Sequence, residues 1–329
     1  MKINYFFRHP GIGHSIHRVF RTLIEELDGS FEISIHEVPC EGSKPIHILW
    51  NNIFVHTKRD KQAINHITGH IHDVILALTG TKTILTIHDL VFLDNVKNPI
   101  KRFYKWLFWL YLPLKIADKV VCISNQTKRN ILSKIYTNKL LVIYNAVDPI
   151  FNHQVRIFNQ DKPVILHIGT GWNKNLNRTI EALNGITCHL RIIGKLYDSQ
   201  IELLENNNIE YSNQFDLTDE DIRNEYVNCD IVNFPSLYEG FGMPIIEGQQ
   251  TGRVVVTSKI EPLIEVSCGA AAFVKPDNIH SIRQAYLNVI SDESYRTSLI
   301  EKGLENAKRF SVKNISHQYK ELYQNIARA

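Results

Sequence analysis

The chain has few cysteines, no long apolar run and no excess of charge of one sign. Its five cysteines, Cys40, Cys122, Cys188, Cys229 and Cys268, are scattered and odd in number, and none forms a C-x-x-C pair. A disulfide framework and a structural zinc site are therefore disfavoured, and a reducing compartment is indicated.

Apolar runs are also short. The longest, from Trp106 to Leu114, falls well below the ~20 residues that a membrane-spanning helix needs. Arg8 and Pro10 come too early for the apolar stretch of a secretory signal. These observations predict a cytoplasmic protein.

The charge balance excludes one class of partner. Net charge is +3, from 37 basic and 34 acidic residues, which gives no reason to expect nucleic acid. The 329 residues exceed an ordinary single core and suit two domains of about 150 residues each. An apolar fraction of 44% and a charged fraction of 22% are typical of globular domains.

Short apolar runs alternate with amphipathic stretches along the whole chain. Strands are predicted at 3–7, 31–38, 46–49, 83–87, 119–123, 140–143, 164–168, 190–193, 209–211, 230–234, 253–257 and 272–274. Helices are predicted between most of them, including 175–183, 219–228, 244–251 and 279–289. Two successive strand–helix series predict an α/β protein with two doubly wound, Rossmann-like domains that face a cleft.

The domain boundaries follow from the same pattern. Residues 1–150 form the first predicted domain and 163–311 the second, with the aperiodic polar segment 151–162 as a linker. The stretch 312–329 is predicted to be a final helix that can pack back on the first domain. Ligands of open parallel sheets bind at the carboxyl ends of strands, so residues just after the strands are the candidates for function.

The strongest motif is the stretch 239–247, EGFGMPIIE, which follows the strand 230–234. Gly240 and Gly242 let the backbone approach a ligand closely, and a proline fits the first turn of the helix that follows. The free N–H groups of that turn can hold an anion. Glu239 and Glu247 bracket the loop and can accept hydrogen bonds from sugar or ribose hydroxyls.

This stretch, continued through the Thr-Gly step at 251–252 and the strand 253–257, resembles the donor-site signature of the retaining GT-B glycosyltransferases of family four (glycosyl transferases group 1). The resemblance covers almost the whole chain and implies two Rossmann-like domains with the active site between them. It implies that Glu239 lies against the donor sugar and that Glu247 binds the ribose. Backbone amides of Phe241, Gly242 and Met243 would then face the sugar and phosphates.

A second motif, GTGWNKNL at 169–176, joins the strand 164–168 to a helix. A turn with Gly169 and Gly171 followed by Lys174 is typical of a diphosphate cradle. The family places a lysine on the donor diphosphate here, which Lys174 matches. It often has an arginine after the first glycine, where this chain has Thr170, and Arg178 is the candidate substitute.

Two further glycine turns follow strands. Gly194-Lys195 resembles the family's position beside the nucleotide base, although a plain turn explains it equally well. Gly11 and Gly13 resemble the family's N-terminal glycine loop near the phosphates. Neither the turn at 11–16 nor the one at 169–174 has the third glycine of a dinucleotide fingerprint, which disfavours a nicotinamide enzyme.

In the first domain, His88 and Asp89 close the strand 83–87. A His-Asp step at a strand end is well placed for a cleft, and the family has a matching histidine near the donor sugar. His88 is therefore the candidate catalytic residue of this domain, together with Glu239 and Lys174 in the second. Asp89 is expected to orient the loop.

The segment 97–117, KNPIKRFYKWLFWLYLPLKIA, mixes basic and aromatic residues. It is either a helix on the protein surface that contacts anionic lipid or a buried helix with a solvated basic end. The first alternative would give peripheral contact with the cytoplasmic membrane face.

Taken together, the sequence predicts a retaining, metal-independent hexosyltransferase that uses a UDP or GDP sugar and no other cofactor. Its acceptor would be a hydroxyl of a glycan or lipid-linked oligosaccharide in cell-surface polysaccharide synthesis. No histidine pairs at metal-ligand spacing with a nearby acid. A nucleotide-sugar-binding protein without transfer activity and a nucleotide-sugar epimerase remain as alternatives.

Overall fold

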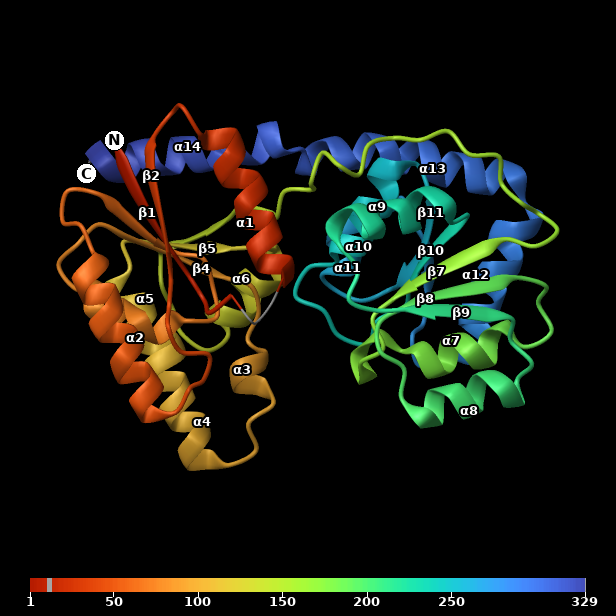
Figure 1. Ribbon diagram of the computed structural model, residues 1–329, viewed down its shortest axis with the longest axis horizontal. Helices are drawn as coiled ribbons and strands as arrows, with labels where there is room; N and C mark the ends of the chain where they lie inside the picture. The colour runs from red at the N-terminus through yellow and green to blue at the C-terminus, as the bar shows by residue number, and fades with distance from the viewer. Residues whose placement is uncertain (11–13, 329) are drawn as a thin grey trace. The chain divides into compact units, whose positions relative to one another are not determined.

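A computed structural model describes residues 1–10 and 14–328 and divides the chain into two compact units (Figure 1). Unit 1 comprises residues 1–146 and 312–329, and unit 2 comprises residues 147–311. Each unit contains a sheet of six parallel strands with helices around it, so the predicted α/β class with two doubly wound domains is confirmed.

The strands of unit 1 are β1 (Lys2–Phe7), β2 (Glu32–Glu37), β3 (Ile64–Ile67), β4 (Thr83–Ile87), β5 (Lys119–Cys122) and β6 (Leu140–Val142). Its helices are α1 (His14–Leu27), α2 (Pro45–Lys58), the 3₁₀ helix η1 (His72–Leu78), α3 (Val91–Asp94), α4 (Pro99–Trp106), the π-helix η2 (Leu107–Tyr111), α5 (Leu112–Ile116), α6 (Asn125–Leu132) and α14 (Val312–Arg328). The strand order is β2-β1-β3-β4-β5-β6. The direction of winding reverses between β1 and β3, and ligands of such sheets bind at this switch point.

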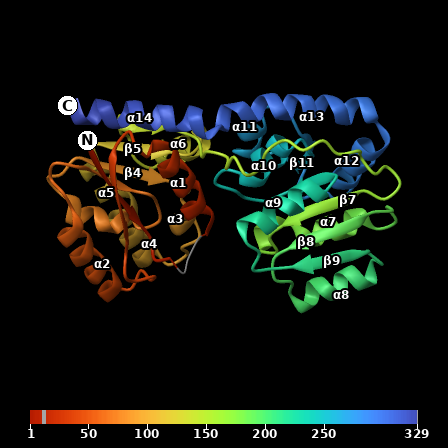
Figure 2. The same cartoon turned by 45° about the horizontal axis from the view of Figure 1, so that its top comes forward.

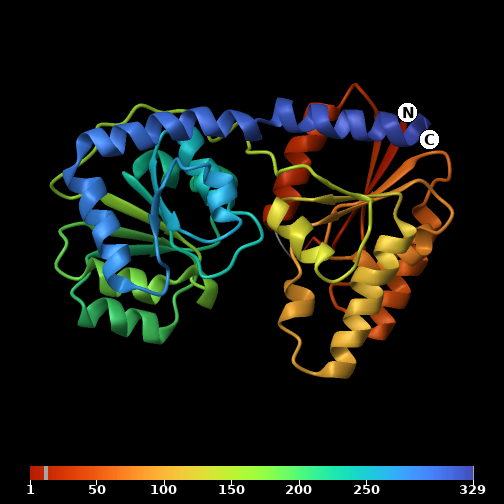
Figure 3. The same cartoon turned by 180° about the vertical axis from the view of Figure 1, so that it is seen from behind.

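Helices cover both faces of the sheet in unit 1. Helices α1 and α14 lie along one face, as Figure 2 shows, and α2, α4 and α5 lie on the other (Figure 3). The apolar stripe of α14, Ile315, Tyr319, Leu322 and Ile326, recurs at spacings of three and four and is buried against the sheet.

A buried polar cluster fixes α14 within unit 1. The hydroxyl of Tyr323 is 2.7 Å from that of Tyr5 and 2.8 Å from Nδ1 of His66, whose Nε2 lies 2.8 Å from the hydroxyl of Thr86. Because buried polar groups are costly when unpaired, this cluster specifies one position of the helix on the sheet.

Two elements of unit 1 differ from the prediction. The run 46–49, predicted as a strand, is the first part of α2, where Pro45 occupies the first turn and the apolar sequence continues for a helical length. The strand β3 was not predicted, because the buried Asn65 and His66 interrupt its apolar run. These two polar side chains can be buried only because the folded structure supplies hydrogen-bond partners for them.

The strands of unit 2 are β7 (Val164–Ile168), β8 (His189–Ile193), β9 (Tyr211–Gln214), β10 (Ile231–Phe234), β11 (Val254–Ser258) and β12 (Ala272–Val274). Its helices are η3 (Trp172–Lys174), α7 (Leu176–Leu183), α8 (Asp198–Asn206), α9 (Asp219–Asn228), α10 (Met243–Thr251), α11 (Leu263–Ser267), α12 (Ile279–Ser291), α13 (Glu293–Ala307) and η4 (Lys308–Phe310). The order β12-β11-β10-β7-β8-β9 is that of dinucleotide-binding sheets, with its switch point between β7 and β10.

The segment 151–162, predicted as a linker, belongs to unit 2. Arg156 Nε donates to the buried carboxylate of Asp230 at 2.8 Å, and the same carboxylate accepts from the backbone of Asn159 and Val164. The irregular segment is thereby attached to the start of β10. The sequence pattern could not show this attachment, because the partner residue is 74 positions away.

Among the described residues, no helix is both long and apolar enough to cross a membrane.

Candidate functional site

The loops that carry both glycine motifs of unit 2 meet at the switch point of its sheet. One follows β7 and the other follows β10, and these strands are neighbours. Gly169 has φ +92°, and a Cβ there would lie 2.8 Å from Cγ of Lys174. The glycine therefore allows a left-handed turn and gives the Lys174 side chain room to cross over it.

Lys174 and Glu239 form an ion pair between these two loops. Nζ of Lys174 donates to Oε1 of Glu239 at 2.6 Å, with side-chain exposures of 25% and 14%. Nζ also lies 4.7 Å from the ring centroid of Phe234. The pair is partly removed from solvent, so its charges are screened less than those of a surface pair.

Two asparagines fix the loops in place. Nδ2 of Asn173 donates to the carbonyl of Tyr238 at 3.2 Å, and the Asn173 carbonyl accepts from the backbone of Leu237 at 2.8 Å. Asn175, at φ +63°, donates from Nδ2 to the carbonyls of Pro235 and Pro276. The sequence analysis did not assign these two residues. A left-handed residue other than glycine at a strand–helix turn is typical of a functional site, but this conformation is visible only in the structure.

Glu247 lies on α10 and is only 2% exposed. Its Oε2 accepts a hydrogen bond of 2.6 Å from the hydroxyl of Tyr226 on α9. Tyr226 had no sequence signal, because nothing in α9 distinguishes it from a core tyrosine. The Tyr226 hydroxyl fixes the orientation of the carboxylate that was predicted to bind ribose.

The loop that begins at Glu239 and Gly240 ends at the first turn of α10, which begins at Met243. Gly242 has φ +113°, and a Cβ there would lie 2.8 Å from Cδ2 of Leu263, so only glycine fits. The ring of Phe241 is buried against Phe310, with centroids 5.8 Å apart. The side chain of Phe241 is therefore turned into unit 2, and Gly242 has no side chain.

The structure shows the contacts of the remaining predicted residues in the glycine turns of unit 2. Gly171 caps η3, its carbonyl accepting from the backbone of Lys174 at 2.9 Å. Gly194 has φ +132° and packs on Thr170, whose hydroxyl donates to the carbonyl of the exposed Lys195 at 2.6 Å. Thr170 therefore links two loops, and it also lines a cavity beside them.

Arg178 extends from α7, and its Nη1 donates to Oδ1 of Asn175 at 3.0 Å. It lines a cavity of about 440 Å³ with Trp172 and Tyr197. The structure thus places Arg178 beside the turn of Lys174, hydrogen-bonded to Asn175.

In unit 1, His88 lies at the carboxyl end of β4 and is 6% exposed. Its Nε2 is 2.7 Å from the carbonyl oxygen of Thr68, which can only accept, so Nε2 carries the proton. Burial, and then the neighbouring His70, lower the pKa of His88 to about 4. The ring is therefore neutral near pH 7, with a lone pair on Nδ1 that can accept a hydrogen bond.

His70 is a residue that the sequence reasoning missed. It has φ +58°, and its ring is stacked on that of His88 with centroids 5.7 Å apart. The preceding Gly69 has φ +133°, and a Cβ there would lie 2.4 Å from Cδ2 of His88. The glycine after the run 64–67 was the one available signal, and it was not used because that run was not recognised as a strand. Asp89 accepts from the backbone of Val91 at 2.9 Å and so orients its loop.

Gly11 and Gly13, predicted to contact the phosphates, lie outside the described residues. They follow β1, which is next to β3 at the switch point of unit 1. No group of three or more metal-ligating side chains occurs in residues 1–10 and 14–328.

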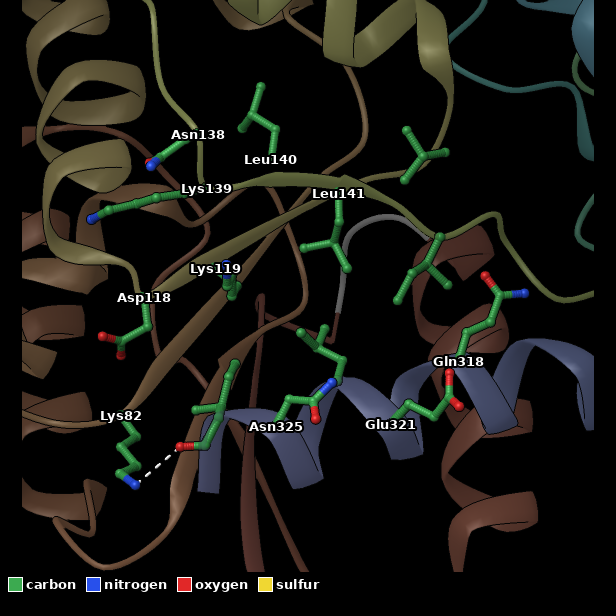
Figure 4. Close-up of a pocket in the computed structure, with 14 residues that line it drawn as sticks. Lys82, Asp118, Lys119, Asn138, Lys139, Leu140, Leu141, Gln318, Glu321 and Asn325 are labelled. Carbon is green, nitrogen blue, oxygen red and sulfur yellow. Dashed lines mark hydrogen bonds between the residues drawn. The ribbon is translucent and has the colours of Figure 1, made fainter. Parts of the chain in front are cut away.

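A larger cavity in unit 1 does not belong to the candidate site. It has a volume of about 720 Å³ and lies between β6 and α14 (Figure 4). Its rim includes Lys82, Asp118 and Lys119, which precede or begin β4 and β5. The cavity is therefore at the amino ends of the strands, whereas His88 is at a carboxyl end.

Two Rossmann-like units, each with a parallel six-stranded sheet and a switch point, are the architecture of the GT-B glycosyltransferases. Comparison with known proteins agrees. The family model "Glycosyl transferases group 1" matches residues 150–306, and the model "Glycosyltransferase Family 4" matches residues 14–151. The chain belongs to this glycosyltransferase family.

Curated relatives are distant or match over part of the chain. An uncharacterized glycosyltransferase of Methanocaldococcus jannaschii is 27% identical over 256 residues, covering 74% of this chain and 68% of the relative. The O-antigen chain mannosyltransferase B of Escherichia coli is 36% identical over 100 residues, which is 30% of this chain and 26% of that protein. A UDP-Gal:α-D-GlcNAc-diphosphoundecaprenol α-1,3-galactosyltransferase of E. coli is 26% identical, covering 62% of this chain and 59% of that one.

Solved structures match the fold over nearly the full length. Sucrose-phosphate synthase from Thermosynechococcus elongatus superposes with a TM-score of 0.82 at 15% identity, covering 99% of both chains. HepE of Anabaena, in complex with UDP and glucose, gives a TM-score of 0.79 at 14% identity, covering 99% of this chain and 100% of that one. At these identities the likeness establishes the fold alone.

Proposed function

We propose that the protein transfers a hexose from a UDP or GDP sugar to a hydroxyl of a glycan or lipid-linked acceptor, with retention of anomeric configuration. The observation that carries the proposal is the Lys174–Glu239 pair at the β7/β10 switch point, with the buried Glu247 on the adjoining helix. A cation for a diphosphate and two carboxylates for hydroxyls are the groups that a nucleotide sugar needs.

In this proposal, Lys174 balances the negative charge that develops on the leaving diphosphate, where a fixed cation stabilises the transition state. Glu239 holds Lys174 in position before the donor binds and then accepts hydrogen bonds from sugar hydroxyls. Glu247, oriented by Tyr226, binds the ribose hydroxyls. Because the ammonium group supplies the positive charge, we propose that no metal ion is required.

The reaction follows from these groups. The bond between the anomeric carbon and the diphosphate oxygen breaks first, giving an oxocarbenium-like ion pair. The acceptor oxygen then bonds to the anomeric carbon on the face that the diphosphate is leaving, and its proton passes to the diphosphate. His88 contributes a neutral Nδ1 that accepts a hydrogen bond from a donor sugar hydroxyl.

The acceptor class is supported by relatives and by one surface. The galactosyltransferase relative is named for an acceptor on diphosphoundecaprenol, and another relative for O-antigen chain synthesis. Within the segment 97–117, Ile100 and Phe103 are 78% and 62% exposed, whereas Trp109 and Leu110 are buried. We therefore restrict the proposed lipid contact of this segment to α4, at the cytoplasmic membrane face.

A ligand screen tests the donor site. Thermal unfolding is measured with UDP, GDP, ADP, dTDP and NAD; a ligand at a hundredfold excess over its Kd adds ~2.7 kcal/mol to the free energy of unfolding. A shift with UDP or GDP supports the site, and a shift with NAD alone contradicts it. Transfer is then followed with the matching sugar nucleotide, and NMR of the product gives its anomeric configuration.

The same assay separates the alternatives. An epimerase changes the donor without an acceptor, and a binding protein gives a thermal shift without any product. Loss of activity in EDTA, restored by a divalent cation, would contradict metal independence. An inverted product would contradict retention.

A further inference from the structure

An arginine follows β1 at the carboxyl edge of the unit 1 sheet. Arg8 comes directly after β1, and continuing the register in which Phe6 faces Ile67 places it opposite Gly69, next to His70. Burial, and then the charge of Arg8, lower the pKa of His70 to about 4. The ends of β1 and β3 flank the switch point of this sheet, where ligands of open parallel sheets bind.

Two buried polar atoms at this place lack a hydrogen-bond partner among the described residues. They are Nε of Arg8 and Nε2 of His17, whose ring packs on that of Phe7 with centroids 5.0 Å apart. The ring of His17 is also hydrogen-bonded to the backbone of Arg8. Because Nε2 has no partner, Nδ1 makes this bond and donates to the carbonyl oxygen, which leaves a lone pair on Nε2.

The acidic side chains of this edge lie beside imidazoles. Oε1 of Glu37, which ends β2, is 3.7 Å from Nδ1 of His17, and Oδ2 of Asp89 is 3.8 Å from Nε2 of His70. Neither carboxylate forms an ion pair with Arg8 in the part of the chain that the structure describes. Burial lowers the pKa of Arg8, but a guanidinium stays charged at every pH at which proteins fold. Arg8 is therefore a partly buried cation without a counter-ion among these residues.

These groups define the chemistry of a ligand. Taking a charge out of water is costly unless an opposite charge or hydrogen bonds compensate it. A phosphate supplies both, because its oxygens match the fork of N–H donors that a guanidinium presents. The lone pair on Nε2 of His17 can accept a hydrogen bond from a hydroxyl. A cation beside a hydroxyl acceptor is complementary to a sugar that carries a phosphate.

We propose that Arg8 binds a phosphate group of the acceptor and that His17 accepts a hydrogen bond from a hydroxyl of the acceptor sugar. This assignment rests on the proposed function, in which a donor sugar hydroxyl lies on His88. Since β3 separates β1 from β4, the strand ends that carry Arg8 and His88 are about 10 Å apart. A sugar ring and its phosphate span a similar length, so the site selects acceptors whose sugar is linked to lipid through phosphate.

The first test uses inorganic pyrophosphate and the variant Lys174→Ala, which removes the proposed cation of unit 2. We expect this variant still to bind pyrophosphate, and we expect the Kd to rise about tenfold or more in Arg8→Gln/Lys174→Ala, because a hydrogen bond between charged groups is lost. Arg8→Lys, which keeps the charge without the fork, should fall between them. Titration calorimetry of the full chain measures each Kd. The matched control is Arg328→Gln/Lys174→Ala, at an exposed arginine of α14.

A second test identifies the source of the phosphate. With Lys174 intact, Arg8→Gln should leave the affinity for UDP or GDP unchanged. Transfer is compared between a short-chain polyprenyl diphosphate sugar and the octyl glycoside of the same sugar. We expect Arg8→Gln to raise KM about tenfold for the diphosphate acceptor only, without a change in kcat. His17→Asn, which keeps a donor near Nδ1 and removes Nε2, should raise KM for both acceptors and leave pyrophosphate binding unchanged.

Three results would overturn the proposal. The first is pyrophosphate binding that is absent from Lys174→Ala or unaffected by the further change Arg8→Gln. The second is weaker UDP or GDP binding in Arg8→Gln, which would assign the anion to the donor. The third is an equal rise in KM for both acceptors in Arg8→Gln, which would mean that Arg8 only supports the structure of unit 1.

Pyrophosphate binding is measured without turnover and without a sugar nucleotide, so the two proposals can fail separately. If pyrophosphate binding depends on Arg8 but no nucleoside diphosphate binds, the transferase proposal fails and the anion site remains. If transfer to the diphosphate acceptor proceeds with the same KM in Arg8→Gln, only the phosphate site fails.

Discussion

The two units share a parallel six-stranded sheet with a switch point, but they build their candidate sites from different chemistry. Unit 2 joins its loops with a charged pair, Lys174 and Glu239, and with asparagine side chains bonded to backbone carbonyls. Unit 1 has neutral, buried imidazoles at the carboxyl ends of its own strands, with His88 stacked on His70. A charged site suits a diphosphate, whereas a neutral one suits hydroxyls.

This difference also explains why the sequence predicted more of the candidate site in unit 2 than in unit 1. In unit 2 the candidate ligand-binding groups are close together in sequence, in two short stretches at 169–176 and 239–247. In unit 1 they come from separate strands, and the register of β3 with β4 brings them together. Breaking one group in each unit tests this contrast.

The largest effect is expected from Lys174→Ala. Removing a cation from the developing charge of the leaving group should lower turnover by ~10²-fold or more. The measurement is kcat with a saturating sugar nucleotide. Lys308→Ala, which removes an exposed lysine paired with Glu305, is the matched control. Full activity in Lys174→Ala would remove the central residue of the proposed site.

In unit 1, Gly69→Ala should cost about 3 kcal/mol of stability, since a left-handed backbone and a contact with His88 are both penalised. Gly80→Ala, with φ +78° and no atom within 4 Å, has the strain alone and should cost about 1 kcal/mol. Urea unfolding measures both. Equal losses would mean that His88 moves freely away from position 69.

Substitutions that mimic one ring nitrogen of His88 at a time test the proposed role of this residue. Asparagine keeps an acceptor near the position of Nδ1, whereas glutamine keeps a donor near that of Nε2 for Thr68. We expect His88→Ala to lower turnover by about tenfold to a hundredfold, in line with loss of one positioned catalytic hydrogen bond. His88→Asn should retain more activity than His88→Gln. The reverse order would show that the Thr68 contact is what matters.

Acid should destabilise unit 1 more steeply than unit 2. Burial lowers the pKa of His66 and His72 to about 3 and that of His70 and His88 to about 4, whereas unit 2 has His167 at about 3. A histidine in the unfolded chain has a pKa near 6.5. Because the unfolded chain therefore binds more protons than the folded chain in this range, the free energy of unfolding decreases as pH falls from about 6.5 to about 4.

Each such group contributes at most about 1.4 kcal/mol per pH unit. Asp73 and Asp89, whose pKa values are raised by burial, offset part of the loss in unit 1. Hydrogen exchange followed by peptide mass spectrometry at several pH values resolves the two units. Equal slopes in both would contradict the prediction.

The smallest effect is expected for Tyr323→Phe. Its hydroxyl bonds Tyr5 and His66, and the loss of this polar link should lower the stability of unit 1 by about 1 kcal/mol. Tyr136→Phe, at a side chain that is 90% exposed, should change nothing. If both variants unfold at the same urea concentration as the wild type, α14 is fixed by its apolar stripe alone.

Much of the fold followed from local pattern. Continuous apolar runs predicted most strands within one or two residues, because a buried parallel strand must be apolar on both faces. The helix 219–228 was predicted with its observed bounds, since its acidic first turn and capping threonine are local signals. At 46–49, where the short apolar run predicted a strand, the structure has the first part of helix α2.

The sequence by itself determined the two-domain α/β class, the glycine turns and the residues of the two motifs in unit 2, because strand periodicity and turn chemistry act over a few neighbouring positions. Only the tertiary structure decided that Lys174 pairs with Glu239, that Tyr226 holds Glu247, and that His70 meets His88. These contacts join residues on different strands and helices, and the packing of whole elements sets their distances.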